Sequence, residues 1–236
     1  MAAIIASRRA EPGVAVACLS LPAMAQYFQV HPANPQPRLI RQAAAILRDG
    51  GVIAYPTDSG YALGCHLGDG DAALRIRRIR DLGDQHHLTL MLNGLSEIGH
   101  FARLDNWQFR IVRQGTPGSY TFVLPATKEV PRRLQHPRRS TVGVRVPDHP
   151  VVRALLEELG EPLLSSTLIL PGRSDPLSDA ATIREVLEKQ LDLVIDSGVC
   201  PAAPTTVVDL AADPPVFLRV GAGDPARLGF ADVEGT

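Results

Sequence analysis

Hydrophobic and polar positions follow two different spacings along the chain, which together predict a mixture of helices and strands. In residues 36–48, Leu39, Ala43 and Leu47 recur at helical spacing, and two glycines follow where the helix would end. Similar spacing predicts further helices at 71–80, 106–114, 129–134, 147–159 and 179–189. Short apolar runs predict strands at 52–55, 88–92, 120–124, 142–146, 163–170, 193–195, 206–210 and 216–220.

This order of elements predicts one α/β domain over residues 24–236. Strands and helices alternate through most of the chain, but the last strands follow one another without full helices between them. We therefore expect a mixed sheet that is antiparallel in part. The sequence has no internal repeat and none of the common glycine-rich, nucleophile-elbow or zinc-helix motifs.

Composition narrows the class of protein only slightly. The chain has 236 residues, 45% of them hydrophobic, and a formal net charge of -1, so contact with nucleic acid would need local basic patches. Three widely spaced cysteines without zinc-ligand spacing fit a reducing, cytoplasmic compartment. No stretch reaches the roughly 18 apolar residues of a membrane helix, so we expect no membrane partner.

The first 23 residues carry a short apolar stretch that Pro12 and Pro22 interrupt. A second methionine, Met24, begins a more ordinary amino terminus. We expect residues 1–23 to be a poorly ordered extension or an incorrectly assigned start.

The segment PTDSGYALG, residues 56–64, is the first candidate for chemistry. Thr57, Asp58, Ser59 and Tyr61 follow the strand at 52–55 within a few residues, and two glycines would let the backbone approach a ligand closely. Read from the residues alone, the segment is either a turn whose polar side chains bond local amides or a loop that holds a ligand.

Other polar positions lie at the ends of predicted strands. Arg145 ends the strand at 142–146, where a guanidinium can grip a carboxylate or phosphate with two hydrogen bonds, or instead form a surface ion pair. Hydroxyl side chains also interrupt or begin strands in the segments 116–121, 165–167 and 204–209. Each of these segments has a purely structural alternative, because hydroxyls bond neighbouring backbone and β-branched residues favour strands.

Arginines form two clusters that could neutralise phosphates or simply be solvated helix faces. The clusters are Arg75, Arg77, Arg78 and Arg80, and Arg132, Arg133, Arg138 and Arg139.

Five of these segments together resemble one family. PTDSGYALG, TPGSYTFVL, TVGVRVPDHP, LLSSTLILPG and PTTVVDL are similar, in this order, to successive signatures of the YrdC/YciO family, and most similar to its YciO branch. The motifs span about residues 36–221. The resemblance implies a twisted mixed α/β sheet flanked by helices, with an open, concave and locally basic face.

The resemblance also implies partners and site residues. The family includes threonylcarbamoyl-AMP synthases, which join L-threonine, bicarbonate and ATP with Mg²⁺ in tRNA modification, and it is associated with tRNA or double-stranded RNA. No tightly bound metal or organic cofactor is implied, and no catalytic residue is assigned. The implied threonine contacts are Thr57, Tyr61, Arg145 and Thr205; the nucleotide contacts are Arg80, Thr121, Thr167 and Arg219; the RNA contacts are Arg75, Arg78, Arg132 and Arg133.

Three positions depart from the synthase pattern. Arg80 stands in place of a lysine, Leu82 in place of an arginine and Ile169 in place of an asparagine. We therefore expect a YciO-type protein that binds a nucleotide or RNA and has at most weak synthase activity. The alternatives are an RNA-binding module without catalysis and an enzyme for a different carboxylate or phosphate substrate.

Overall fold

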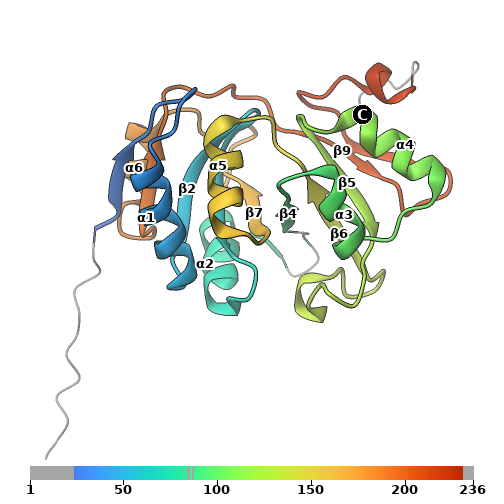
Figure 1. Ribbon diagram of the computed structural model, residues 1–236, viewed down its shortest axis with the longest axis horizontal. Helices are drawn as coiled ribbons and strands as arrows, with labels where there is room; N and C mark the ends of the chain where they lie inside the picture. The colour runs from blue at the N-terminus through green and yellow to red at the C-terminus, as the bar shows by residue number, and fades with distance from the viewer. Residues whose placement is uncertain (1–23, 84–85, 87, 231–236) are drawn as a thin grey trace, which may run out of the picture.

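The protein, described by a computed structural model over residues 24–83, 86 and 88–230, is built on one sheet of ten strands (Figure 1). The expectation for residues 1–23 lies outside this range. The strand order is β1-β8-β2-β3-β7-β4-β6-β5-β9-β10. The strands are β1 (Gln26–Gln29), β2 (Ile53–Thr57), β3 (Gly60–His66), β4 (Thr89–Met91), β5 (Tyr120–Pro125), β6 (Thr141–Arg145), β7 (Leu163–Thr167), β8 (Leu193–Asp196), β9 (Thr206–Asp209) and β10 (Val216–Arg219).

Six α-helices and two 3-10 turns connect the strands. Their bounds are α1 (Pro37–Arg48), α2 (Gly70–Arg80), α3 (Leu95–Phe101), α4 (Asn106–Gly115), η1 (Arg132–Leu134), α5 (Pro150–Leu159), α6 (Ala180–Leu187) and η2 (Pro225–Leu228). Within the described residues, no helix is long and apolar enough to cross a membrane.

The helices bury two hydrophobic clusters on opposite faces of the sheet. Ile53 and Tyr55 of β2 pack with residues of α1 and α5, whereas Ala54 between them packs with the cluster that includes α2, α6 and residues near α3 and α4. Because successive side chains of a strand point to opposite faces, this alternation assigns each helix to a face.

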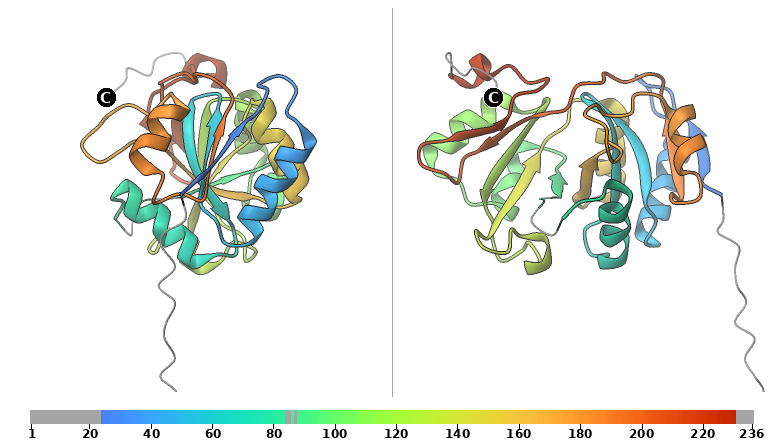
Figure 2. Two further views of the ribbon diagram at one scale, coloured as in Figure 1. Left: turned by 90° about the vertical axis from the view of Figure 1, so that its left-hand side faces the viewer. Right: turned by 180° about the vertical axis from the view of Figure 1, so that it is seen from behind.

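The face that α1 and α5 cover becomes open farther along the sheet. Directly opposed residues of neighbouring strands share a face. The register links Ser165 of β7 to Thr89 of β4, Thr89 to Gly143 of β6, and Gly143 to Val123 of β5. Twist accumulates across the ten strands, so this open part of the face turns toward α2, which lies on the other side of the molecule (Figure 2).

The expected fold class is confirmed, with differences in detail. The sheet is mixed: β1–β8, β2–β8, β4–β6 and β5–β9 are parallel, and the other pairs are antiparallel. The helix predicted at 129–134 is wrong in extent, since only the 3-10 turn η1 forms there. Strand β1 and helix α3 were not predicted, and PTDSGYALG contains the ends of two paired strands rather than a long loop.

Candidate functional site

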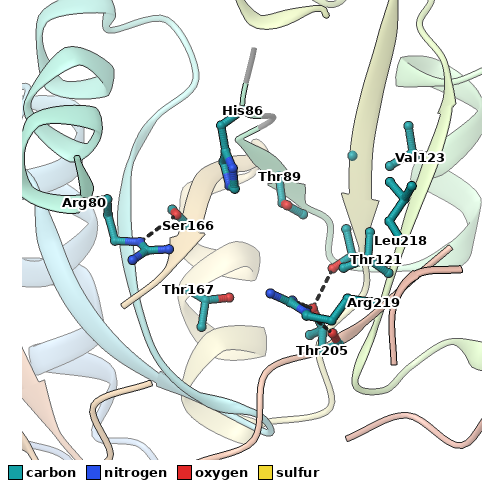
Figure 3. A pocket seen from close by; sticks show the side chains of 12 residues that line it. Arg80, His86, Thr89, Thr121, Val123, Ser166, Thr167, Thr205, Leu218 and Arg219 are labelled. Carbon is teal, nitrogen blue, oxygen red and sulfur yellow. Dashed lines mark hydrogen bonds between the residues drawn. The ribbon is translucent and has the colours of Figure 1, made fainter. Parts of the chain in front are cut away.

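A cavity of about 310 Å³ lies where the open sheet face meets the end of α2 (Figure 3). It combines positive charge from α2 and β10 with hydroxyl and apolar side chains from the sheet. Its lining residues are Arg80, His86, Thr89, Thr121, Val123, Gly143, Ser166, Thr167, Thr205, Val207, Leu218 and Arg219.

Two arginines face this cavity without a carboxylate partner among the described residues. Arg219 donates from Nε to the Thr205 carbonyl oxygen at 2.8 Å and from Nη2 to the Thr205 hydroxyl at 2.9 Å. Arg80, the last residue of α2, is 3.4 Å from the Ser166 hydroxyl through its Nε. Both side chains are therefore oriented by neutral acceptors, which leaves their positive charge to act on the cavity.

Burial and mutual repulsion perturb the cations of the cavity. Desolvation, followed by the charge of Arg219, lowers the pKa of Arg80 to about 10. Desolvation and then the charge of Arg145 lower the pKa of Arg219. The pKa of His86 is lowered by burial first and then by Arg80, Arg77 and Arg219. These directions describe a site whose positive charge is not compensated and which an anion would stabilise.

The sheet contributes hydroxyls and an apolar wall. The hydroxyls of Thr121 and Thr205 are 3.2 Å apart and share one hydrogen bond. Leu218 lines the cavity and is 55% exposed, so an apolar part of a ligand can cover it. Cations, hydroxyls and apolar surface in one cavity suit a ligand that carries phosphate, ribose-like and planar apolar parts.

The PTDSGYALG segment forms a hairpin turn beside the cavity, not part of its lining. The Thr57 hydroxyl donates to the Gly60 carbonyl oxygen at 2.6 Å and accepts from the Ser59 amide at 3.1 Å. Gly60 has φ +119°, a backbone conformation that favours glycine, and Pro176 packs against it. The hydroxyl of Thr57 therefore stabilises the turn.

The carboxylate at the tip of this hairpin pairs with Arg145. Asp58 Oδ1 is 2.5 Å from Arg145 Nη2, and both side chains are largely buried, at 14% and 5% exposure. Asp58 Oδ2 accepts from the Ser119 hydroxyl at 2.7 Å. Arg145 Nε is buried and has no partner in the described structure. Arg145 is thus two residues along β6 from the cavity residue Gly143, with one guanidinium edge only partly used.

Tyr61, the other predicted threonine contact in the hairpin, lies in the core. Its hydroxyl donates to the Gly198 carbonyl oxygen at 3.0 Å, and burial raises its pKa. Of the eight predicted small-molecule contacts, the structure brings five together in the cavity: Arg80, Thr121, Thr167, Thr205 and Arg219. Thr57, Tyr61 and Arg145 lie outside its lining.

The predicted RNA contacts lie on the outer side of α2 and η1. Arg75 pairs with Asp192 at 2.9 Å, and Arg133 donates to the Gly68 carbonyl oxygen at 2.7 Å. Arg78 and Arg132 are exposed. Arg133 reaches the start of α2, so the two arginine clusters border one another.

The described residues contain no group of three or more His, Cys, Asp or Glu side chains that could hold a metal ion. The acidic side chain at the hairpin, Asp58, is already bonded to Arg145 and Ser119.

Comparison with known proteins identifies the family of this site. Residues 45–221 match the Sua5/YciO/YrdC family model, which carries the description telomere recombination. The chain belongs to the Sua5/YciO/YrdC family. It is 55% identical to YciO of Escherichia coli strain K12 over 201 residues, which cover 85% of this chain and 98% of that protein. It is 32% identical to a threonylcarbamoyl-AMP synthase of Halorhodospira halophila over 165 residues, 70% of this chain and 85% of the relative.

Solved structures of the same family have the same fold. The crystal structure of E. coli YciO matches with a TM-score of 0.85 at 54% identity and covers 87% of this chain and all of that one. The structure of P. abyssi Sua5 complexed with L-threonine matches with a TM-score of 0.76 at 27% identity, over 83% of this chain and 57% of that one. The resemblance inferred from the five sequence segments is confirmed.

The three departures from the synthase pattern of the Sua5/YciO/YrdC family have different surroundings. Arg80 lines the cavity, whereas Leu82 packs against the hydrophobic core. Thr167 keeps a hydroxyl in the lining, and Ile169 is not among the lining residues.

Sequence reasoning missed His86 and Thr89, which also line the cavity. A lone histidine in a polar segment and a threonine that begins a short strand carry no motif. For Thr89 the available signal was its place at the start of a predicted strand, because such positions gather at a sheet end.

Proposed function

We propose that this protein binds a nucleotide in the Arg80–Arg219 cavity, with the phosphates near the two guanidiniums. The observation that carries the proposal is that both cations are more than half desolvated and face hydroxyls rather than described carboxylates. Arginine binds phosphate with directed hydrogen bonds, and such bonds strengthen in a partly desolvated site. The family membership and the synthase relatives support ATP as the first ligand to test.

The test is an ATP titration by calorimetry with the wild type, Arg219→Gln and Arg80→Gln. A lost hydrogen bond to a charged group costs about 1.5–3 kcal/mol, so each variant should bind roughly 10–100-fold more weakly. Arg78→Gln is the matched control, because Arg78 is exposed on the same helix two residues away and should leave affinity unchanged. Equal affinities for all four proteins would place the nucleotide elsewhere.

Magnesium would enter this site with the nucleotide. The described residues hold no group of ligands for a metal, so the phosphates and water would supply most of its coordination. The residues of the cavity would orient the phosphates, and the ion would neutralise part of their charge.

The proposed reaction is weak synthesis of threonylcarbamoyl-AMP. Support comes from the relative named as that synthase, and from the family structure named as a complex with L-threonine. Thr205 lines the cavity, and Arg145 continues its floor with an unpartnered Nε that can donate to a carboxylate. Thr57 and Tyr61 would act by shaping the wall behind this end, since their hydroxyls bond the backbone.

Positioning and charge neutralisation would carry such a reaction without a protein nucleophile. Arg80 and Arg219 would neutralise the phosphates while Arg145 holds the carboxylate of threonine. Leu82 and Ile169 supply none of the polar groups expected at those positions, and each such loss typically costs about 10²–10³ in rate. Incubation with ATP, bicarbonate, Mg²⁺ and labelled L-threonine should give slow product formation. A rate equal to that of a threonylcarbamoyl-AMP synthase measured alongside would refute the weak-activity part.

A second candidate function is binding of tRNA or double-stranded RNA along α2 and η1. The favouring observation is that Arg133 bonds Gly68 next to the start of α2, which joins the two arginine clusters into one basic border. Exposed Arg78 and Arg132 would contact phosphates, while Arg75 is already paired with Asp192.

Binding through phosphates predicts a linear fall of log affinity with log salt concentration. The double variant Arg78→Gln/Arg132→Gln should reduce the slope by about 2, since each lost phosphate contact contributes about 0.9. Duplex RNA and tRNA titrations between low and moderate salt measure the slope. An unchanged slope in the double variant would exclude these two arginines from the contact.

A further inference from the structure

His86 is the cavity residue that neither the sequence motifs nor the proposed nucleotide contacts explain. Its ring points into the cavity between Arg80 on α2 and Arg219 on β10 (Figure 3). We propose that His86 is a third, titratable donor to the anionic ligand, so that binding of a phosphate-bearing ligand takes up a proton on its imidazole ring. This inference rests on the proposed nucleotide site and adds proton-linked selection of the ligand's charge.

The position of His86 is fixed through its backbone. Arg77 donates from Nη2 to the His86 carbonyl oxygen at 3.0 Å and from Nη1 to the Gly83 carbonyl oxygen at 2.9 Å. One side chain of α2 therefore anchors the residue beside Arg80, which belongs to the same helix. An anchored histidine is available to a ligand without a large rearrangement of the chain.

The charges that act on the ring are all positive. Arg80 and Arg77 act from α2 and Arg219 from β10. The sheet face opposite contributes the hydroxyls of Thr89 and Thr121 and no charge to the lining. None of the described carboxylates forms an ion pair with His86.

These surroundings keep the imidazole neutral before the ligand binds. Burial, followed by the charges of the three arginines, lowers the pKa of His86 below its usual value. A neutral imidazole donates one hydrogen bond, whereas the protonated ring donates two and carries a positive charge. A bound phosphate chain would offset the arginine charges and favour the protonated ring.

The sign of the effect follows from proton linkage. Since the ligand raises the pKa of His86, the complex binds more protons than the free protein between the two pKa values. Affinity should therefore rise as pH falls from the pKa in the complex to the pKa in the free protein, and level off below it. A rise of about one pKa unit corresponds to about tenfold tighter binding.

The experiment compares ATP binding by the wild type, His86→Gln and the control His100→Gln, whose histidine is exposed and distant from the cavity. Calorimetry between pH 5.5 and 8 in two buffers of different ionisation enthalpy counts the protons taken up. Titration of ATP itself is common to all three proteins and cancels in the comparison. The wild type and His100→Gln should gain about tenfold more affinity toward low pH than His86→Gln, with correspondingly larger proton uptake.

A second measurement follows the histidine ring protons of the wild type by NMR. Addition of ATP should move the titration of one resonance, the one missing in His86→Gln, to higher pH. If ATP binds but proton uptake is the same in His86→Gln and wild type, the inference is overturned while the nucleotide site stands. If ATP does not bind to the wild type, the proposed function fails and this inference fails with it.

Discussion

The buried pair between Asp58 and Arg145 gives the sharpest test of how this site is held together. Asp58→Asn removes the negative charge but keeps a side-chain oxygen that can accept hydrogen bonds. In the wild type this carboxylate bonds Arg145 at 2.5 Å, the Ser119 hydroxyl at 2.7 Å and the Asp148 amide at 3.3 Å. It therefore ties the hairpin, the loop before β5 and the end of β6 to one another.

The expected loss of stability follows from the burial of Arg145. Its side chain is 5% exposed and its Nε already lacks a partner, so little water can replace the lost charge. Removing one partner of a buried ion pair typically costs 3–5 kcal/mol. Because asparagine keeps an acceptor, we expect about 3 kcal/mol, or roughly 6–12 °C in Tm for a chain of this length.

The assay is urea and thermal unfolding of the wild type, Asp58→Asn and Asp58→Asn/Arg145→Met. The double variant should be more stable than Asp58→Asn, since it no longer buries an unpaired charge. Glu161→Gln is the control: its pair with His66 is half exposed and should contribute below about 1 kcal/mol. A loss below about 1 kcal/mol in Asp58→Asn would refute the view that Arg145 depends on this carboxylate.

Three further predictions concern other parts of the molecule. Gly60→Ala should cost about 1–3 kcal/mol by urea unfolding, because φ is +119° and a Cβ would approach Pro176 Cβ to 2.8 Å. Asp179→Ala should cost about 1 kcal/mol at pH 7, since Asp179 caps α6. Hydrogen bonds from Thr182 lower the pKa of Asp179, so its contribution should be lost as pH falls through that lowered value, and the two proteins should converge at low pH. Arg80→Gln should raise the stability of the ligand-free protein by about 1 kcal/mol in the same unfolding assay.

The sequence was informative where local pattern decides structure. The helical spacing of Leu39, Ala43 and Leu47 matches α1, and the apolar runs match most strands. The strand β1 was missed because its sequence, QYFQ, alternates little and it pairs with β8, far away in the chain. Its position depends on contacts such as Tyr27 with Asp196, which no local pattern reveals.

The candidate site was predictable only in pieces. Hydroxyls and arginines at strand ends marked Thr121, Thr205 and Arg219, but their convergence depends on the pairing of β5 with β9 and of β9 with β10. The residues alone could not decide whether Thr57 faces a ligand or bonds its own turn. In the structure the turn takes the hydroxyl, because a two-residue connection between β2 and β3 leaves backbone groups that need a nearby partner.

The distribution of carboxylates separates the two ends of the site. Asp58 neutralises Arg145, whereas no described carboxylate neutralises Arg80 or Arg219. The pKa of Arg80 is lowered to about 10 by burial and by Arg219, which means that folding places this cation where its charge is unfavourable. The side chain is partly exposed, and solvent screening reduces the cost to about 1 kcal/mol. A structural arginine would lose stability on substitution; a ligand-binding one should gain stability in Arg80→Gln while losing affinity for ATP. Opposite signs in the two assays would therefore identify Arg80 as a residue kept for its ligand.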